Sequence, residues 1–155
     1  MGLDLAEVAK LIGIAPPDAT QLAPGELIDR LENVLAATGR YLRQIPDARL
    51  GDSLPGRDRS LRELGHHVFV IGDAFLDVTR GEVLTAERLA VAPEDWMRTG
   101  TDLDLFGSGV RDRLSEWWSG CDEADCEAPA KTYYGPQTLH QVLERTAWHS
   151  AQHAR

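Results

Sequence analysis

The amino-acid sequence predicts an all-α protein, a four-helix bundle preceded by a short N-terminal helix and a linker. Apolar residues recur at intervals of three and four in four separate segments, which is the spacing of amphipathic helices. No segment alternates apolar and polar residues over a length that would indicate a β-strand. Polar connectors that carry Gly and Pro separate the segments, notably at residues 46–58 and 120–137. Four helices of this length, with one long connection after the second, are typical of a helical bundle.

The first predicted bundle helix spans residues 25–45. Pro24 lies just before it, and Pro46 ends it because proline cannot continue a helix. The residues expected to face the core are Leu27, Leu31, Val34, Tyr41 and Ile45, with Leu35 and Leu42 beside them.

The second predicted helix spans residues 60–78. Ser60 and Glu63 match the capping-box pattern, in which the two residues satisfy each other's backbone N–H groups. The apolar residues of this segment have the three-four spacing of a narrow bundle seam. They are Leu61, Leu64, Val68, Ile71, Phe75 and Val78.

The third and fourth predicted helices span residues 110–118 and 138–154. The third is short and carries Val110, Leu114, Trp117 and Trp118 on its apolar side. The fourth begins with a second capping box, formed by Thr138 and Gln141. We therefore divide the chain into an N-terminal helix and linker, residues 1–24, and a bundle domain, residues 25–155.

Length and charge limit the function classes. A chain of 155 residues suits one domain with a substantial core. The net charge of −9 repels phosphate backbones, so we expect no nucleic-acid partner. No apolar run approaches the roughly 20 residues of a membrane span, and no signal peptide is apparent. We expect a cytoplasmic protein without a membrane partner.

Two histidines near the C-terminus form an H-x3-H pair on the last predicted helix. His149 and His153 continue the inward stripe, whereas His140 is expected on the outer face. An i, i+4 pair places two imidazoles on one helix face, within reach of a common metal ion. The alternative is that both are ordinary cations at a helix C-terminus, where they complement the helix dipole.

A third histidine favours the metal interpretation. His67 lies on the flank of the second helix that faces the bundle interior, whereas its neighbour His66 points almost opposite. His67, His149 and His153 are therefore the candidate metal ligands. Three neutral imidazoles leave open positions for water or substrate, as in catalytic zinc sites.

The sequence offers no inward acidic residue as a fourth ligand or general base. Glu63, Asp73, Asp77 and Glu144 all fall on polar faces, where we expect solvated charges. Imidazole ligands suit zinc, nickel, iron or copper, so the spacing does not choose among these divalent ions.

Two cysteines, Cys121 and Cys126, lie in the acidic stretch GCDEADCEAP. Their C-x4-C spacing differs from the C-x2-C of zinc knuckles and thioredoxin-type motifs, and no second pair exists. They are either loop thiols without a role or a local disulfide or redox-sensitive pair.

The stretches RSLRELGHHVF and LERTAWHSAQHAR together resemble the DinB/YfiT-like superfamily. The resemblance covers roughly residues 25–155. It implies a four-helix bundle that binds a divalent metal, zinc, nickel or iron, through a histidine of the second helix and the H-x3-H of the last. Carried over to this chain, His67, His149 and His153 occupy the ligand positions, and His66 does not.

The wording YYGPQTLHQVLERTAWHSAQHAR is similar to DinB-like domains fused behind glutaredoxin-like domains. The N-terminal GLDLAEVAKLIG also resembles the closing helix of a glutaredoxin-like domain, so residues 1–24 are expected to be a remnant of, or a link to, such a domain. One departure is that the last helix ends two residues after His153, whereas the family's helix continues for several turns.

The resemblance implies two functions. The first is a metal-dependent transferase or isomerase that uses a low-molecular-weight thiol on a small electrophile. The second is a non-catalytic metal-binding or stress-response module that acts through a homodimer or a partner. Trp148, expected on the outer face of the last helix, and the pair Trp117–Trp118 favour the second.

Overall fold

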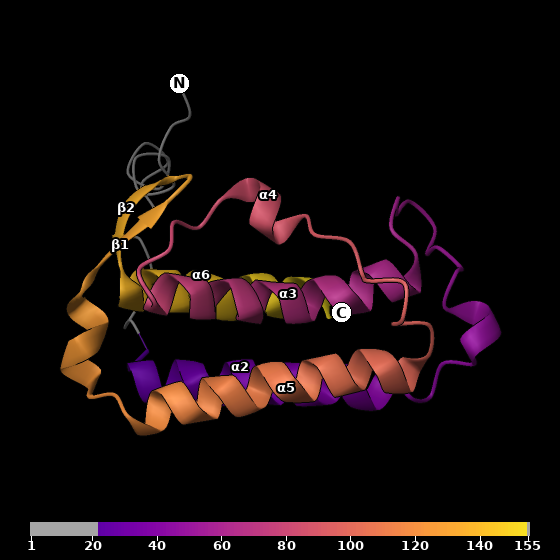
Figure 1. The fold of residues 1–155 in the computed structure, drawn as a ribbon, viewed down its shortest axis with the longest axis horizontal. Coiled ribbons are helices and arrows are strands. Elements are labelled where there is room, and N and C mark those ends of the chain that lie inside the picture. The colour runs from indigo at the N-terminus through magenta and orange to yellow at the C-terminus, as the bar shows by residue number, and fades with distance from the viewer. Residues whose placement is uncertain (1–21, 155) are drawn as a thin grey trace, which may run out of the picture.

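The computed structural model describes residues 22–154 and contains a bundle of four long helices. Figure 1 shows two layers, with α3 beside α6 in one and α2 beside α5 in the other. The predicted all-α, four-helix bundle is confirmed. The N-terminal helix expected before residue 15 lies outside the described residues. The four helices are α2 (Pro24–Leu42), α3 (Leu61–Thr79), α5 (Gly100–Ser119) and α6 (Leu139–His153).

The connection between α3 and α5 is long because these two helices run in the same direction. The chain must return along the whole bundle, and it crosses over α3 with the short helix α4 (Ala86–Leu89) on its way (Figure 1). The remaining connections carry the 3₁₀ helices η1 (Asp47–Arg49) and η2 (Glu123–Glu127). The long connection after the second helix was predicted, and it covers a face of α3 that would otherwise meet solvent.

A β-hairpin precedes α6, where the sequence predicted only a connector. Strands β1 (Pro129–Thr132) and β2 (Gly135–Thr138) pair in an antiparallel register that joins Thr132 to Gly135. Gly135 has a φ of 113°, which favours glycine at this turn. Four residues per strand are too few to produce a visible alternation, which is why the pattern did not reveal them.

The hairpin is tied to the long connection rather than to the bundle core alone. The Leu84 N–H donates to the Lys131 carbonyl at 3.0 Å, and the Tyr133 N–H donates to the Leu84 carbonyl at 2.8 Å. Two segments that are distant in sequence are therefore held together beside α3 and α6.

Helix α5 begins ten residues before the predicted start at residue 110. The side chain of Thr99 caps its first turn by accepting from the N–H of Asp102. The first half of α5 was missed because a glycine stands where the helical period would place an apolar residue. This glycine, Gly107, faces Phe69 so closely that a Cβ atom would lie 2.3 Å from the Phe69 ring. The buried stripe has the expected three-four spacing only when the glycine is counted. It comprises Leu103, Gly107, Val110 and Leu114.

The buried face of α2 is rotated from the predicted one. Tyr41 was expected in the core, but it is 66% exposed, and Val34 and Ile45 are only partly buried. The residues that face the core extend from the start of the helix to its last turn and are Leu27, Ile28, Leu31, Leu35 and Leu42. Leu42 ends α2 against Gly65 and Gly100 of the neighbouring helices, which fixes this rotation.

Helix α3 is buried on nearly all sides between residues 64 and 72, because α5, α6 and the α4 connection surround it. Asp73 and Asp77 were expected to be solvated, but the structure pairs both with Arg88 at 2.6 Å. Asp73 also pairs with Arg113 at 2.7 Å. These ion pairs fasten α4 and α5 to the outer side of α3.

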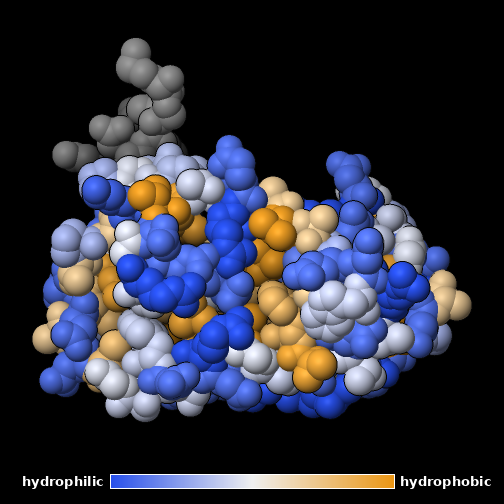
Figure 2. Space-filling model, in the orientation of Figure 1, coloured by the Kyte–Doolittle hydropathy of each residue, from blue (hydrophilic) through white to orange (hydrophobic). Residues whose placement is uncertain are grey.

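The surface is predominantly hydrophilic on the face that carries α4 and α5. Figure 2 shows hydrophobic side chains there as separate patches between hydrophilic ones. None of the helices within residues 22–154 combines the length and apolar character needed to cross a membrane.

Candidate metal centre

The structure brings together the side chains of His67, His149 and His153. One ligand nitrogen from each lies within 4.8 Å of the other two. The His67 ring centroid is 5.4 Å from that of His149 and 4.7 Å from that of His153, and the last two are 4.9 Å apart. The cluster predicted from helical spacing is thus present as a geometric arrangement.

Helix geometry and helix caps position these rings. His149 and His153 are one turn apart on α6, whose start is fixed by the Thr138 side chain accepting from the Gln141 N–H. His67 lies in the second turn of α3, which starts at the Ser60–Glu63 capping box. Because α3 and α6 are antiparallel neighbours, the first turns of α3 face the last turns of α6 (Figure 1).

All three imidazoles are held neutral near physiological pH. Burial lowers the pKa of His67 from 6.5 to about 4, with a further lowering by the positive charge of Arg59 and by the other two histidines. Burial is also the main cause that lowers the pKa values of His149 and His153, and Arg59 acts on both. Neutral imidazoles have the free lone pairs that a metal ion requires.

Three imidazole nitrogens, one of them buried without a hydrogen-bond partner in residues 22–154, fit a divalent metal. Nδ1 of His153 is buried and has no hydrogen-bond partner among the described residues. A buried polar atom without a partner carries a free-energy cost, which a metal ion coordinated by that nitrogen would remove. The backbone of Leu89 lies near the His67 ring and partly opposes the lowering of its pKa.

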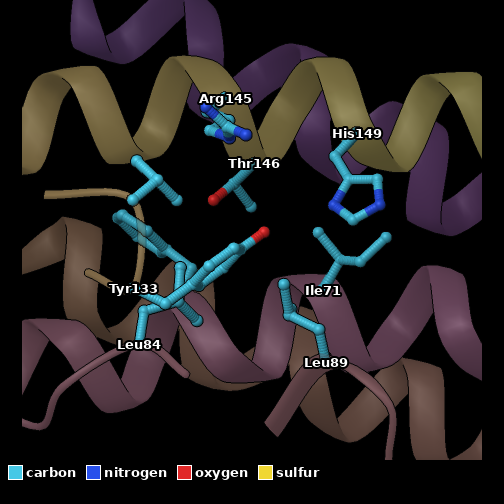
Figure 3. A pocket seen from close by; sticks show the side chains of 9 residues that line it. Ile71, Leu84, Leu89, Tyr133, Arg145, Thr146 and His149 are labelled. Carbon is cyan, nitrogen blue, oxygen red and sulfur yellow. The ribbon is translucent and has the colours of Figure 1, made fainter. Parts of the chain in front are cut away.

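A narrow recess between α3 and α6 reaches this cluster. Figure 3 shows Thr146 and His149 projecting from α6 toward the side of the recess that carries Ile71 and Leu89, and Arg145 also lines the recess. The recess has about 20 Å³ of space, enough for about one water molecule. His149 therefore lies at the boundary between the recess and the histidine cluster.

Two other histidines lie outside the cluster. His66 was predicted to point away from the bundle, yet it is buried and stacks on Phe106 of α5, with 5.2 Å between ring centroids. His140 was predicted on the outer face, yet its Nε2 lies 2.8 Å from the carbonyl oxygen of Leu22. Packing by α5 covers His66, and Leu22 contacts His140, which helical angles alone could not reveal.

The two cysteines are free thiols. Burial and the nearby Cys121 raise the pKa of Cys126 to about 11, and burial raises the pKa of Cys121 as well. Reactive thiols have lowered pKa values, so this pair lacks the electrostatics of a nucleophile.

A sequence model of the DinB superfamily matches residues 30–155, which is most of the chain. The chain belongs to the DinB superfamily. A search of curated proteins finds no match. In this DinB-superfamily protein the matched region contains the helices that carry His67, His149 and His153. A fusion to a glutaredoxin-like domain stays an expectation from the sequence.

Several residues beside the cluster were not predicted. The backbone of Leu89 reaches His67 from the α4 connection, and Arg59 lies in the loop before α3. Both come from segments without apolar periodicity, so their positions depend on how the loops pack. A buried Tyr134 hydroxyl, without a hydrogen-bond partner in residues 22–154, also lines the recess.

Proposed function

We propose that this protein is a metal-dependent enzyme that transfers a low-molecular-weight thiol to a small electrophile, or uses it in an isomerisation. The observation that supports this most directly is the cluster of three neutral imidazoles within 4.8 Å of one another, of which His67 is buried and the other two are partly buried. His67, His149 and His153 would hold the ion, with zinc, nickel or iron as candidates. When bound, a divalent cation lowers the pKa of a coordinated thiol and supplies thiolate at neutral pH.

Residues of the chain keep the His67 imidazole neutral, hold its ring in place and limit water beside the histidine cluster. The low pKa of His67 keeps its lone pair available, and burial in α3 holds its ring beside those of His149 and His153. Ile71 and Leu89 line the recess beside His149 and limit the water that enters it. In the transfer, the thiol loses its proton to water, and its sulfur forms a bond to the electrophilic carbon. The leaving group departs with the displaced electron pair.

The set of three protein ligands favours a reaction over a purely structural site. Structural zinc sites in proteins are closed by four ligands, whereas catalytic sites keep a position open. Within residues 22–154, no carboxylate or thiolate joins the three histidines in a common cluster. A fourth position would therefore be available to a substrate.

The test is to measure metal content and thiol binding on the same protein. We expect the calorimetric heat from a thiol such as glutathione or cysteine to be larger in the metal-loaded protein than in the chelated protein, and this difference to disappear in His153→Ala. A matched control is His140→Ala, which removes a histidine of the same helix outside the cluster. Equal thiol heats in the chelated and the metal-loaded protein would overturn the proposal.

The second candidate function is a non-catalytic metal-binding module that acts through a homodimer or a partner. Its support is Trp148, which is 61% exposed on the outer side of α6. Trp117 and Trp118, the other tryptophans considered for this role, are partly buried. The ring centroid of Trp117 lies 5.2 Å from that of Phe75. Sedimentation of the wild type and of Trp148→Ser separates the candidates: a dimer that dissociates in the variant favours the module.

A further inference from the structure

An open groove runs along the outer flank of α6 beside the β-hairpin. Its space of about 740 Å³ lies within the range of roughly 300–1,000 Å³ that is common for small-molecule sites. Three amide side chains line it, Gln137 from β2 and Gln141 and Gln152 from α6. Such a set of amides can donate and accept hydrogen bonds along an extended polar ligand.

The groove is connected to the histidine cluster. Tyr133, Arg145 and His149 line both this groove and the narrow recess between α3 and α6. A ligand that lies in the groove therefore has one end beside His149, which belongs to the cluster. The recess has room for about one non-hydrogen atom, so the larger part of such a ligand must stay in the groove.

Opposite charges face the groove without pairing with each other. Glu144 and Arg145 both line it, and within residues 22–154 neither has an ion-pair partner within 4.0 Å. The Arg145 guanidinium is held 3.9 Å from the centre of the Tyr134 ring, which restricts its position by a cation–π contact. A fixed arginine is suited to bind a carboxylate, and a nearby glutamate is suited to bind an ammonium group.

Two aromatic side chains form the walls of the groove. Tyr133 is 52% exposed and Trp148 is 61% exposed, and both line the groove. Covering such exposed aromatic surface with a ligand removes it from water, and this burial favours binding. The groove thus combines stacking surfaces, amides and one group of each charge.

We propose that this groove binds the peptide-like part of a zwitterionic thiol, one that carries a carboxylate, an ammonium group and at least one amide bond. Arg145 holds the carboxylate, Glu144 holds the ammonium group, and the sulfur end reaches His149 through the shared mouth. The placement of the sulfur end beside His149 rests on the proposed function. The groove's affinity for the peptide-like part depends on the groove residues alone.

The experiment uses S-methylglutathione, whose sulfur is blocked by a methyl group. We expect calorimetric binding to the full chain both with and without metal, accompanied by a change in tryptophan emission that is lost in Trp148→Phe. Arg145→Met and Glu144→Gln should each weaken binding at least tenfold while the stoichiometry of metal binding stays unchanged. The matched control is Arg40→Met, which removes an exposed arginine of α2 outside the groove.

Three outcomes overturn the groove assignment. They are no binding of S-methylglutathione, equal binding by wild type and Arg145→Met, or tighter binding of the hydroxyl-rich probe methyl β-glucoside at the same site. Failure of the proposed function has a different signature, because unblocked thiols would then give the same heat with and without metal. If groove binding fails while metal-dependent thiol heat persists, the groove assignment alone is wrong.

Discussion

Two adjacent histidines of α3 have different environments, and this difference can be tested. His67 lies in the cluster with the α6 histidines, whereas His66 is buried against Phe106. We predict that His67→Ala lowers metal stoichiometry from one to near zero and that a His66 variant retains it. Mass spectrometry of the native protein measures the ratio directly.

Because His66 is part of the core, His66→Ala risks unfolding by leaving a cavity. His66→Phe keeps the stacking surface on Phe106 and serves as the second variant. Equal metal loss from His67→Ala and from folded His66→Phe would contradict the assignment of the ligands.

The lowered pKa of His67 makes the metal-free protein sensitive to acid. The folded pKa of about 4 lies below the ordinary value of 6.5, so between these values the unfolded chain binds more protons. The contribution to stability is complete above pH 6.5 and is lost as the pH falls toward 4. At 1.36 kcal/mol per pKa unit the full loss is roughly 3 kcal/mol.

Urea unfolding of the metal-free protein between pH 7 and pH 4 measures this effect. His67→Asn should flatten the dependence, because it removes the titrating group while keeping a polar side chain of similar size. An identical pH dependence in wild type and variant would show that other groups dominate.

At the scale of the elements, the α4 connection holds one side of the site. Arg88 pairs with Asp73 and Asp77 on α3, and the next residue, Leu89, lines the recess beside His149. We predict that Arg88→Met lowers the free energy of unfolding by about 1–3 kcal/mol, since charge-assisted hydrogen bonds are lost. It should also weaken metal binding, because the segment that packs beside the histidine cluster loses its attachment to α3.

Urea unfolding and a metal titration on the same variant provide both values. Arg49→Met is the control, because the Arg49–Asp52 pair is largely exposed and such pairs contribute about 0–1 kcal/mol. If Arg88→Met is destabilised with unchanged metal affinity, the α4 connection is only a structural brace.

The end of α2 contacts the start of α5 at a point where only glycine fits. A Cβ atom at Gly100 would lie 2.0 Å from the Leu42 carbonyl oxygen, and backbone cannot move aside as a flexible side chain can. We predict that Gly100→Ala costs about 1–3 kcal/mol, the range for overpacked sites. Gly51→Ala, with no atom within 4 Å of the new methyl group, should change the melting temperature little.

At the scale of the whole molecule, bound metal should stabilise the fold. A ligand at 100 times its dissociation constant adds about 2.7 kcal/mol when it binds only the native state. For a domain of this size, each kcal/mol raises the melting temperature by about 2–4 °C. We therefore expect zinc or nickel to raise the melting temperature by roughly 5–10 °C at pH 7.5, and a chelator to reverse it.

His149→Ala and His153→Ala should each abolish this response, and His140→Ala should retain it. Since burial lowers the pKa values of all three candidate ligands, the response should fade only at a pH below that expected from the ordinary pKa of histidine. A wild-type melting curve unmoved by both metal and chelator at pH 7.5 would refute metal binding.

The sequence by itself determined the bundle class, its long connection and the three clustered histidines. Each depends on spacing within one helix: apolar residues recur with the helical period, and His149 and His153 are one turn apart. The helical angle also separates His67 from His66 on α3. The histidine cluster was predictable because its three members lie on the inward sides of two long helices.

Only the tertiary structure decided what covers the other helix faces. His66, His140 and the start of α5 departed from the predictions because segments distant in sequence pack on them. The hairpin and the α4 connection have no periodicity of their own, and their positions come from contacts such as Leu84 with Lys131. Burial imposed by distant segments leaves no regular pattern in the local sequence, because it depends on which surfaces meet after folding.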